Sequence, residues 1–360
     1  MAKIDLFLKE MLDLNGSDLH LIVGLPPKIR VHGNLRALDE PPVTTTDMDA
    51  ILSEICPPVR WEEFCEVSDL DFAYEIEGLA RFRCNYLVNH YGKAAVLRQI
   101  PSKILTFDDL SLPEILKQVC EYKSGLVFVT GPTGSGKSTT MAAMIDYINA
   151  NHMKHIITIE DPIEFVHQNQ KSIIVHREVG EHSDSFANAL MGGMRADPDI
   201  ILLGEMRELE TIRLALSCAS MGMLVFGTLH TNNAPKTIDR VIDAFPAEEQ
   251  SQIRTILAQC LTAVVSQLLC RTADGKGRCA VLEILLRNEA LPNVIREGQI
   301  SSIRNIIEQG SQEGMASMDA GLRNLLAEGK INELEAYMKA SDKKEFAQYL
   351  PEHTVLGAES

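Results

Sequence analysis

The sequence predicts an α/β protein in two parts, a small α+β domain followed by a larger domain built on parallel strands. Three observations support this. Short alternating strands separated by turns dominate up to about residue 100. From residue 114 onward, short apolar runs alternate with helical stretches, as in βαβ units. One of those runs leads through a glycine-rich loop directly into a helix.

The first domain is expected over residues 1–100, and residues 101–113 are expected to be a linker. Apolar residues at helical spacing predict helices over 4–14 and 46–56. Alternating patterns bounded by turn residues predict strands over 17–23, 28–34, 79–87 and 94–100.

The second domain is expected over residues 114–360, and it ends in helices. The predicted strands, each followed by a polar loop, are 126–130, 156–159, 200–203, 224–228 and 280–285. The predicted helices include 139–148, 318–326 and 331–338. Because sheets of this kind bind ligands beyond the carboxyl ends of their strands, the residues at those ends are the first candidates for a site.

The loop after the first of these strands matches the pattern G-x-x-x-x-G-K-[ST]. Its glycines let backbone N–H groups curl around a phosphate, and the start of the following helix adds partial positive charge. Lys137 would reach the outer phosphates, and the Ser138 hydroxyl would ligate Mg²⁺. The predicted nucleotide-binding residues are Gly131, Pro132, Thr133, Gly134, Ser135, Gly136, Lys137, Ser138 and Thr139.

Three further predicted strands end in polar residues. Glu160, Asp161 and Glu164 follow the second strand, Glu205 follows the third, and His230 follows the fourth. Transfer of a phosphoryl group to water needs a metal and a group that orients the water, and a carboxylate suits either task. The simpler alternatives are a solvated loop acid for Glu205, a helix cap for the first three acids, and a core histidine for His230.

Two arginines of the first domain are candidates for contacting a nucleotide. Alternation along residues 81–86 places Arg81 and Arg83 on one strand face and the apolar residues on the other. These side chains could simply form a solvated face. Alternatively, Arg83 and Arg98 stabilise charge in the transition state, as arginine fingers do.

Composition excludes several classes of protein. The formal net charge of −16 at pH 7 and the lack of a basic run disfavour a nucleic-acid motor. The eight cysteines form no C-x-x-C pair, which indicates reduced thiols in a cytoplasmic protein. Neither a signal peptide nor an apolar run long enough for a membrane span is present, so membrane association is expected only through a partner.

The four strand ends together resemble the Walker A, aspartate, Walker B and histidine boxes of the secretion ATPases of type II secretion and type IV pili. The boxes correspond to residues 131–138, 160–167, 204–207 and 227–231. Further segments resemble the pilus retraction ATPases within that family, namely 16–21, 24–27, 81–83, 209–213 and 245–248. The resemblance covers about residues 3–330.

The resemblance implies a hexameric ring in which a PAS-like domain precedes a RecA-like P-loop core, with ATP and Mg²⁺ bound between the two domains. It assigns Glu205 and Glu164 to the Walker B and aspartate boxes, where with Ser138 they would hold Mg²⁺, partly through water. It assigns His230 to the histidine box, and Arg83 and Arg98 to the paired arginines that reach the nucleotide. The implied activity is ATP hydrolysis that drives pilus retraction through an inner-membrane platform protein.

Two of the chain's departures from that group bear on its activity. Residues 189–195 read Ala-Leu-Met-Gly-Gly-Met-Arg, so one arginine of the retraction ATPases is replaced by Met191, and two adjacent glycines should weaken a helix by roughly 2 kcal/mol. Residues 220–223 read Ser-Met-Gly-Met, so Met223 stands where the group has a histidine. The alternative function is therefore a weakly active or accessory ring subunit that supports an active paralogue.

Overall fold

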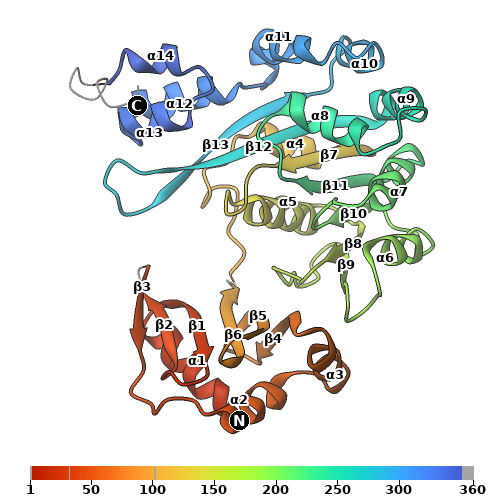
Figure 1. The fold of residues 1–360 in the computed structure, drawn as a ribbon. Coiled ribbons are helices and arrows are strands. Elements are labelled where there is room, and N and C mark those ends of the chain that lie inside the picture. The colour runs from red at the N-terminus through yellow and green to blue at the C-terminus, as the bar shows by residue number, and fades with distance from the viewer. Residues whose placement is uncertain (1, 32, 101–102, 351–360) are drawn as a thin grey trace. The chain divides into compact units, whose positions relative to one another are not determined.

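The computed structural model describes residues 2–31, 33–100 and 103–350. Its contacts divide the chain into two compact units (Figure 1). One comprises Met1–Lys103 with Asp161–Val166, and the other comprises Ile104–Glu160 with His167–Ser360. Residue 32 of the predicted strand 28–34, residues 101–102 of the predicted linker and the last ten residues of the predicted second domain lie outside the described residues.

The first unit is an antiparallel sheet with helices packed against it. Its strands lie in the order β3-β2-β1-β6-β5-β4, and every neighbouring pair is antiparallel. The strands are β1 (Gly16–Ile22), β2 (Lys28–Val31), β3 (Asn34–Ala37), β4 (Asp69–Ile76), β5 (Ala80–Asn89) and β6 (Gly92–Ile100). The helices are α1 (Lys3–Asp13), α2 (Thr45–Ile55) and α3 (Pro58–Val67).

The alternation predicted along residues 81–86 is confirmed in β5. Phe82, Cys84 and Tyr86 are buried in the core of this unit, whereas Arg81 and Arg83 lie on the other face. Because successive side chains of a strand point to opposite faces, this arrangement leaves one face of β5 for charged residues. The sequence patterns did not predict α3 and β4, which complete the unit.

The second unit is built on a sheet with the strand order β13-β12-β7-β11-β10-β8-β9. All neighbouring pairs are parallel except β12 and β13, which form an antiparallel hairpin. The strands are β7 (Gly125–Thr130), β8 (His155–Glu160), β9 (Ile173–Glu178), β10 (Ile200–Leu203), β11 (Leu224–Leu229), β12 (Leu261–Arg271) and β13 (Arg278–Leu286). The predicted strands are thus found, and β9 and β12 were not predicted.

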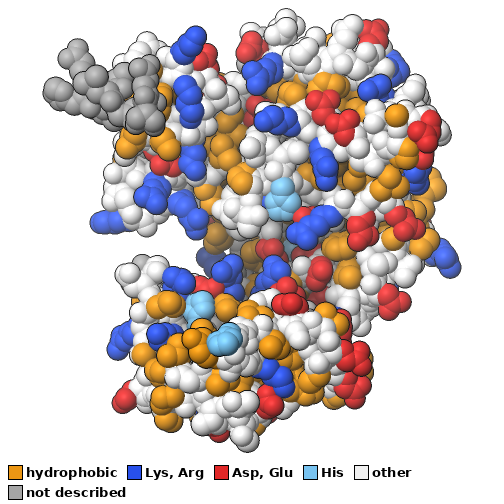
Figure 2. Space-filling view, in the orientation of Figure 1, with side chains coloured by type: hydrophobic (Ala, Val, Ile, Leu, Met, Phe, Trp, Pro, Cys, Tyr) orange, Lys and Arg blue, Asp and Glu red, His pale blue; other side chains and the backbone are white. Residues whose placement is uncertain are grey.

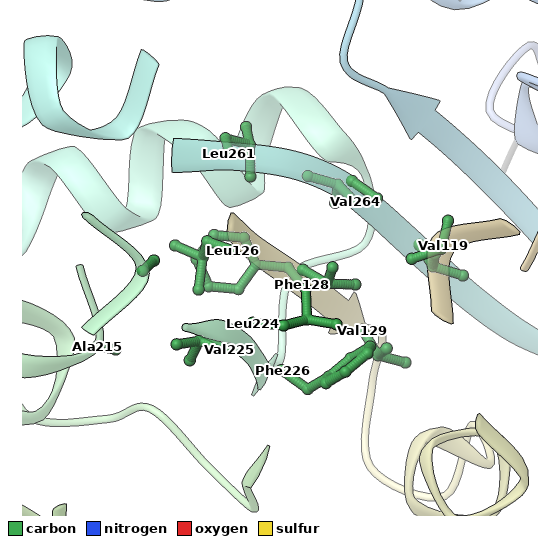
Figure 3. Packing of buried hydrophobic residues seen from close by; sticks show 14 of the residues in the cluster. Val119, Leu126, Phe128, Val129, Ala215, Leu224, Val225, Phe226, Leu261 and Val264 are labelled. Atoms are coloured by element: carbon green, nitrogen blue, oxygen red, sulfur yellow. The ribbon is translucent and has the colours of Figure 1, made fainter. Parts of the chain in front are cut away.

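Helices cover both faces of this sheet. Every residue of β7, β10 and β11 is buried, which requires a packed layer on each side. Figure 3 shows Leu126, Phe128 and Phe226 of the two central strands packed together with residues from the surrounding elements. The helices are α4 (Ile115–Cys120), α5 (Lys137–Asn151), α6 (Phe186–Gly193), α7 (Leu209–Ser220), α8 (Ala234–Asp243), α9 (Gln250–Cys260), α10 (Leu291–Arg296) and α11 (Ile303–Gln309).

The hairpin of β12 and β13 extends to a group of C-terminal helices (Figure 1). These helices are α12 (Met318–Ala327), α13 (Glu333–Lys339) and α14 (Lys343–Ala347). Cys270 and Val281 of the hairpin pack with Leu322 and Phe346 in a small separate core. The predicted α/β fold class, with a parallel sheet in the larger part, is confirmed.

All eight cysteines are free thiols, and most of them are buried. Within residues 2–31, 33–100 and 103–350, we find no helix with the length and apolar character that crossing a bilayer requires.

Candidate nucleotide-binding site

The glycine-rich loop connects the carboxyl end of β7 to the first residue of α5. Gly131, Gly134 and Gly136 have φ angles of +146°, +77° and +86°, which favour glycine. A Cβ on Gly131 would lie 2.3 Å from the carbonyl oxygen of Gln267 and 2.6 Å from Ser135 Oγ. The first glycine is therefore required by a close approach as well as by the turn.

The loop presents groups suited to a phosphate. Lys137 is 8% exposed, and its Nζ donates to the carbonyl oxygens of Gly131, at 2.8 Å, and Pro132, at 3.1 Å. Ser135 is also buried, and its Oγ has no hydrogen-bond partner among the described residues. A buried ammonium beside a buried hydroxyl that has no hydrogen-bond partner among the described residues favours an anionic ligand at this point.

Strand β12 supports the loop from the side. The Gln267 side chain donates from Nε2 to the carbonyl oxygen of Ser135 at 2.8 Å and accepts from the Thr140 hydroxyl at 2.7 Å. One residue earlier, the hydroxyls of Ser266 and Thr130 hydrogen-bond to each other at 2.8 Å. The sequence analysis missed this support because no local pattern predicted β12 as a strand.

Glu205 and His230 are in direct contact at the same edge of the sheet. Glu205 follows β10 and His230 follows β11, and these strands are parallel neighbours. His230 Nε2 lies 2.7 Å from Glu205 Oε1, and because a carboxylate only accepts, Nε2 is the donor. Arg207 Nε also donates to Glu205 Oε1. The structure thus brings together two of the predicted catalytic residues.

Hydrogen bonds and side-chain packing hold the segment that carries Glu205 against neighbouring strand β11. Met206 is 1% exposed, and its backbone N–H donates to the carbonyl oxygen of Thr228 at 3.1 Å. The Thr228 hydroxyl in turn donates to the carbonyl oxygen of Gly204. Met206 packs over Gly227, where a Cβ would lie 2.3 Å from its sulfur. These contacts fix the backbone position from which the Glu205 side chain extends.

The other three predicted catalytic residues belong to the first unit. Arg83 and Arg98 are directly opposite each other on β5 and β6. Arg98 Nε donates to Asp18 Oδ1 at 2.7 Å, and Arg83 Nε donates to Asp71 Oδ1 at 3.4 Å. Glu164 lies in the segment Asp161–Val166. The roles of these three residues at a nucleotide remain predictions.

Asp18 is a buried carboxylate that the sequence analysis did not single out. It is 4% exposed and lies between Arg98 and Arg30, whose Nε is 3.9 Å away. Burial raises the pKa of Asp18, but hydrogen bonds from Ser17 and Arg98 outweigh it, and the pKa lies below its usual value. Asp18 is therefore ionised at neutral pH and restrains Arg98.

The last residue of the predicted aspartate box, His167, stacks on His176 of β9. The rings of His167 and His176 are 5.8 Å apart and nearly parallel. His176 Nε2 accepts from the backbone N–H of His167 at 3.1 Å, and its Nδ1 lies 2.8 Å from the Thr158 hydroxyl. Burial, with the nearby His176, lowers the pKa of His167 to about 4. His167 is therefore neutral at physiological pH.

The fold and the loop define a P-loop nucleotide-binding protein of the α/β class, with a carboxylate and a histidine at neighbouring strand ends. The family described as "Type II/IV secretion system protein" matches residues 2–338. The chain therefore belongs to this family, and the predicted membership of the secretion ATPases is confirmed.

Individual relatives are similar over nearly their whole length. The protein named "Type IV pilus retractation ATPase PilT" of Pseudomonas aeruginosa is 48% identical over 92% of this chain and 96% of its own. The "Type IV pilus ATPase PilU" of the same organism is 37% identical over 98% of this chain and 91% of its own. A crystal structure of the pilus retraction motor PilT with bound ADP is 41% identical, covers 97% of this chain and 99% of its own, and has a TM-score of 0.89.

Proposed function

We propose that this chain is an ATPase motor that drives type IV pilus retraction. The observation that carries the proposal is the Glu205–His230 contact, at the same edge of a parallel sheet as the loop of Lys137. Neighbouring strands lie about 4.8 Å apart, so these groups lie within reach of one bound triphosphate. The relatives named as pilus retraction ATPases support the choice of ATP and of the pilus.

In ATP hydrolysis, the phosphate loop, Glu205 and His230 each have a separate role. The loop backbone and Lys137 bind and orient the β- and γ-phosphates, and Glu205 orients the water that attacks the γ-phosphorus. His230 holds Glu205 Oε1 in place, so that the other carboxylate oxygen, Oε2, is directed at the site. The water's oxygen forms the new bond to the γ-phosphorus, and a proton of the water passes to a phosphate oxygen. The bond between the γ-phosphorus and the β-phosphate oxygen breaks, and ADP and inorganic phosphate leave.

Magnesium would accompany ATP. Within the described ranges there is no group of three or more His, Cys, Asp or Glu side chains that could hold a metal by itself. This fits a cation carried by the phosphates and the Ser138 hydroxyl, with Glu164 and Glu205 reached partly through water. When bound, Mg²⁺ neutralises charge on the phosphate oxygens. Arg83 and Arg98 would add charge stabilisation from the first domain.

We assign the parts of the chain as the resemblance implies. Residues 1–100 form a PAS-like domain, 101–113 a linker, and 114–360 the RecA-like ATPase domain with its C-terminal helices. The working particle is a hexamer of this chain, alone or mixed with a paralogue. It acts in the cytoplasm at the inner membrane, bound to a polytopic platform protein and not inserted in the bilayer.

Binding to nucleic acid forms no part of the proposal. The net charge of −16 opposes it, and on the face shown in Figure 2 basic and acidic side chains are interspersed over both units. A nucleic-acid motor would be stimulated by DNA or RNA, and we expect no such stimulation of the ATPase rate.

The second candidate is a weakly active ring subunit that supports an active paralogue. It is favoured by Met191 and Met223, which replace polar residues of the retraction ATPases, and by the match to PilU, which covers 98% of this chain against 92% for PilT. Intact Glu205, His230 and Lys137 favour the active motor instead.

The steady-state ATPase rate with Mg²⁺ tests both candidates, measured with a size determination in the presence of ATP. An active motor predicts turnover on a particle of about six subunits, and loss of that turnover in Lys137→Ala. Glu205→Ala should bind ATP but lose turnover, and Arg83→Ala should slow turnover far more than it weakens binding. ATP binding without turnover in the unmodified chain would establish the accessory subunit and overturn the motor.

A further inference from the structure

The buried amide of Gln267 joins the phosphate loop to the helix that follows it. Gln267 is 2% exposed and lies on β12, next to the strand that leads into the loop. Its Nε2 donates to the carbonyl oxygen of Ser135 in the loop, and its Oε1 accepts from the Thr140 hydroxyl in α5. One side chain thus satisfies two buried polar groups, one on each side of the Lys137 backbone.

The glycines of the loop also leave room for this residue. A Cβ on Gly131 would lie 2.3 Å from the Gln267 carbonyl oxygen, and a Cβ on Gly136 would lie 2.8 Å from Gln267 Nε2. A loop with several glycines has many accessible conformations, so it binds phosphate well only when something outside it restricts them. Among the contacts of the loop, those of Gln267 come from a distant part of the chain and are shielded from water.

We propose that Gln267 is a positioning residue that holds the phosphate loop in its binding conformation, a role that rests on the proposed nucleotide site. It acts through Ser135 and Thr140 and does not itself touch the phosphates. The loop must be ordered equally for the bound substrate and for the transition state. Removal of the Gln267 side-chain contacts therefore weakens the binding of both to the same extent. The expected signature is a higher Kd and KM for ATP with kcat nearly unchanged.

The variant Gln267→Met keeps the length of the side chain and removes both hydrogen bonds. We expect the Kd of ATP with Mg²⁺ and the KM to rise roughly tenfold, and kcat to stay within about threefold. The matched control is Thr262→Val, which removes one hydrogen bond from the same strand to the Leu126 carbonyl oxygen, at the far end of β7 from the loop. Its Kd should stay within about twofold.

If Gln267→Met does not fold, a second pair of variants tests the positioning role of Gln267. Thr140→Val removes the donor to Gln267 without changing the shape of the side chain, whereas Thr140→Ser keeps the hydroxyl. The valine variant should raise the Kd for ATP several-fold, and the serine variant should restore most of the affinity. Equal affinities in the two variants, or a kcat that falls with KM unchanged in Gln267→Met, would overturn the positioning role.

Hydrogen exchange separates this proposal from the proposed function. Without nucleotide, the amides of the loop should exchange faster in Gln267→Met than in the unmodified chain, and Thr262→Val should leave them unchanged. A chain that binds no ATP refutes the nucleotide site, while this exchange measurement still decides whether Gln267 orders the loop. Unchanged exchange in Gln267→Met would refute the positioning role even in a chain that binds ATP.

Discussion

Replacing Gly227 by alanine should disable Glu205 while leaving the phosphate loop intact. The new Cβ would lie 2.3 Å from Met206 Sδ and 3.3 Å from its Cγ, whereas ordinary contacts begin at 3.4 Å. The sulfur must therefore move by about 1 Å, and because Met206 is 1% exposed it has no open space to enter. Met206 is bonded to Glu205, so the movement displaces the carboxylate from His230. A misplacement of about 1 Å can cost roughly 100-fold in rate.

The assay is the steady-state ATPase rate together with the equilibrium Kd for ATP. Gly227→Ala should lower kcat roughly 100-fold and change the Kd by less than about threefold, because the three atoms nearest to the new Cβ all belong to Met206 and none to the phosphate loop. Adding Met206→Ala returns the lost space and should recover much of the rate. A folded Gly227→Ala protein whose kcat stays within twofold of the unmodified chain would refute the role of Met206 in placing Glu205.

Two further predictions concern buried titratable side chains. Asp18→Asn should lower the free energy of unfolding by about 1–2 kcal/mol in a urea titration at pH 7, since Arg98 loses a charged partner but is itself largely exposed; if Arg98 contacts ATP, kcat falls as well. His167 has a folded-state pKa of about 4 against an ordinary value of 6.5, so on acidification the unfolded chain takes up the proton first. Stability should therefore fall as the pH drops below 6.5, by about 2 kcal/mol at pH 5. In the variant His167→Gln, the free energy of unfolding should not show this decrease of about 2 kcal/mol at pH 5. An equal pH dependence of unfolding in the two proteins would show that His167 is not its cause.

The central strands could be predicted because their signal is local. Residues 126–130 and 200–203 are apolar runs bounded by polar loops, and β7 and β10 correspond to them closely. Strand β12 gave no such signal because α9 ends at Cys260 and β12 begins at Leu261, without a glycine or proline between them. A pattern of apolar residues that crosses a helix-to-strand junction reads as a longer helix.

The parts of the site whose residues are contiguous in the sequence could be predicted. The loop of residues 131–138 forms a motif by itself, and the strand ends of Glu205 and His230 follow from the apolar runs before them. Their 2.7 Å contact depends on the pairing of β10 with β11, which no local pattern specifies. For the same reason the support from Gln267 could not be foreseen without β12.

The departure at the two adjacent glycines has a structural explanation that bears on activity. Gly192 and Gly193 are the last two residues of α6, where a glycine costs less than it does inside a helix. Arg177 of β9 donates from Nη1 to the Ala189 carbonyl oxygen at 2.8 Å, and a Cβ on Gly192 would lie 3.0 Å from that nitrogen. The glycine therefore admits an arginine that satisfies the helix end.

The interior penalty of roughly 2 kcal/mol expected from sequence thus overstates the weakening of α6. Because α6 is formed, Met191 changes the charge on its surface and leaves the sheet behind it in place. Met223, in turn, is partly buried and packs against the main core, just before β11. The departures therefore leave the strand ends of Glu205 and His230 intact, and any loss of activity in this chain would have to come from the absent polar side chains themselves.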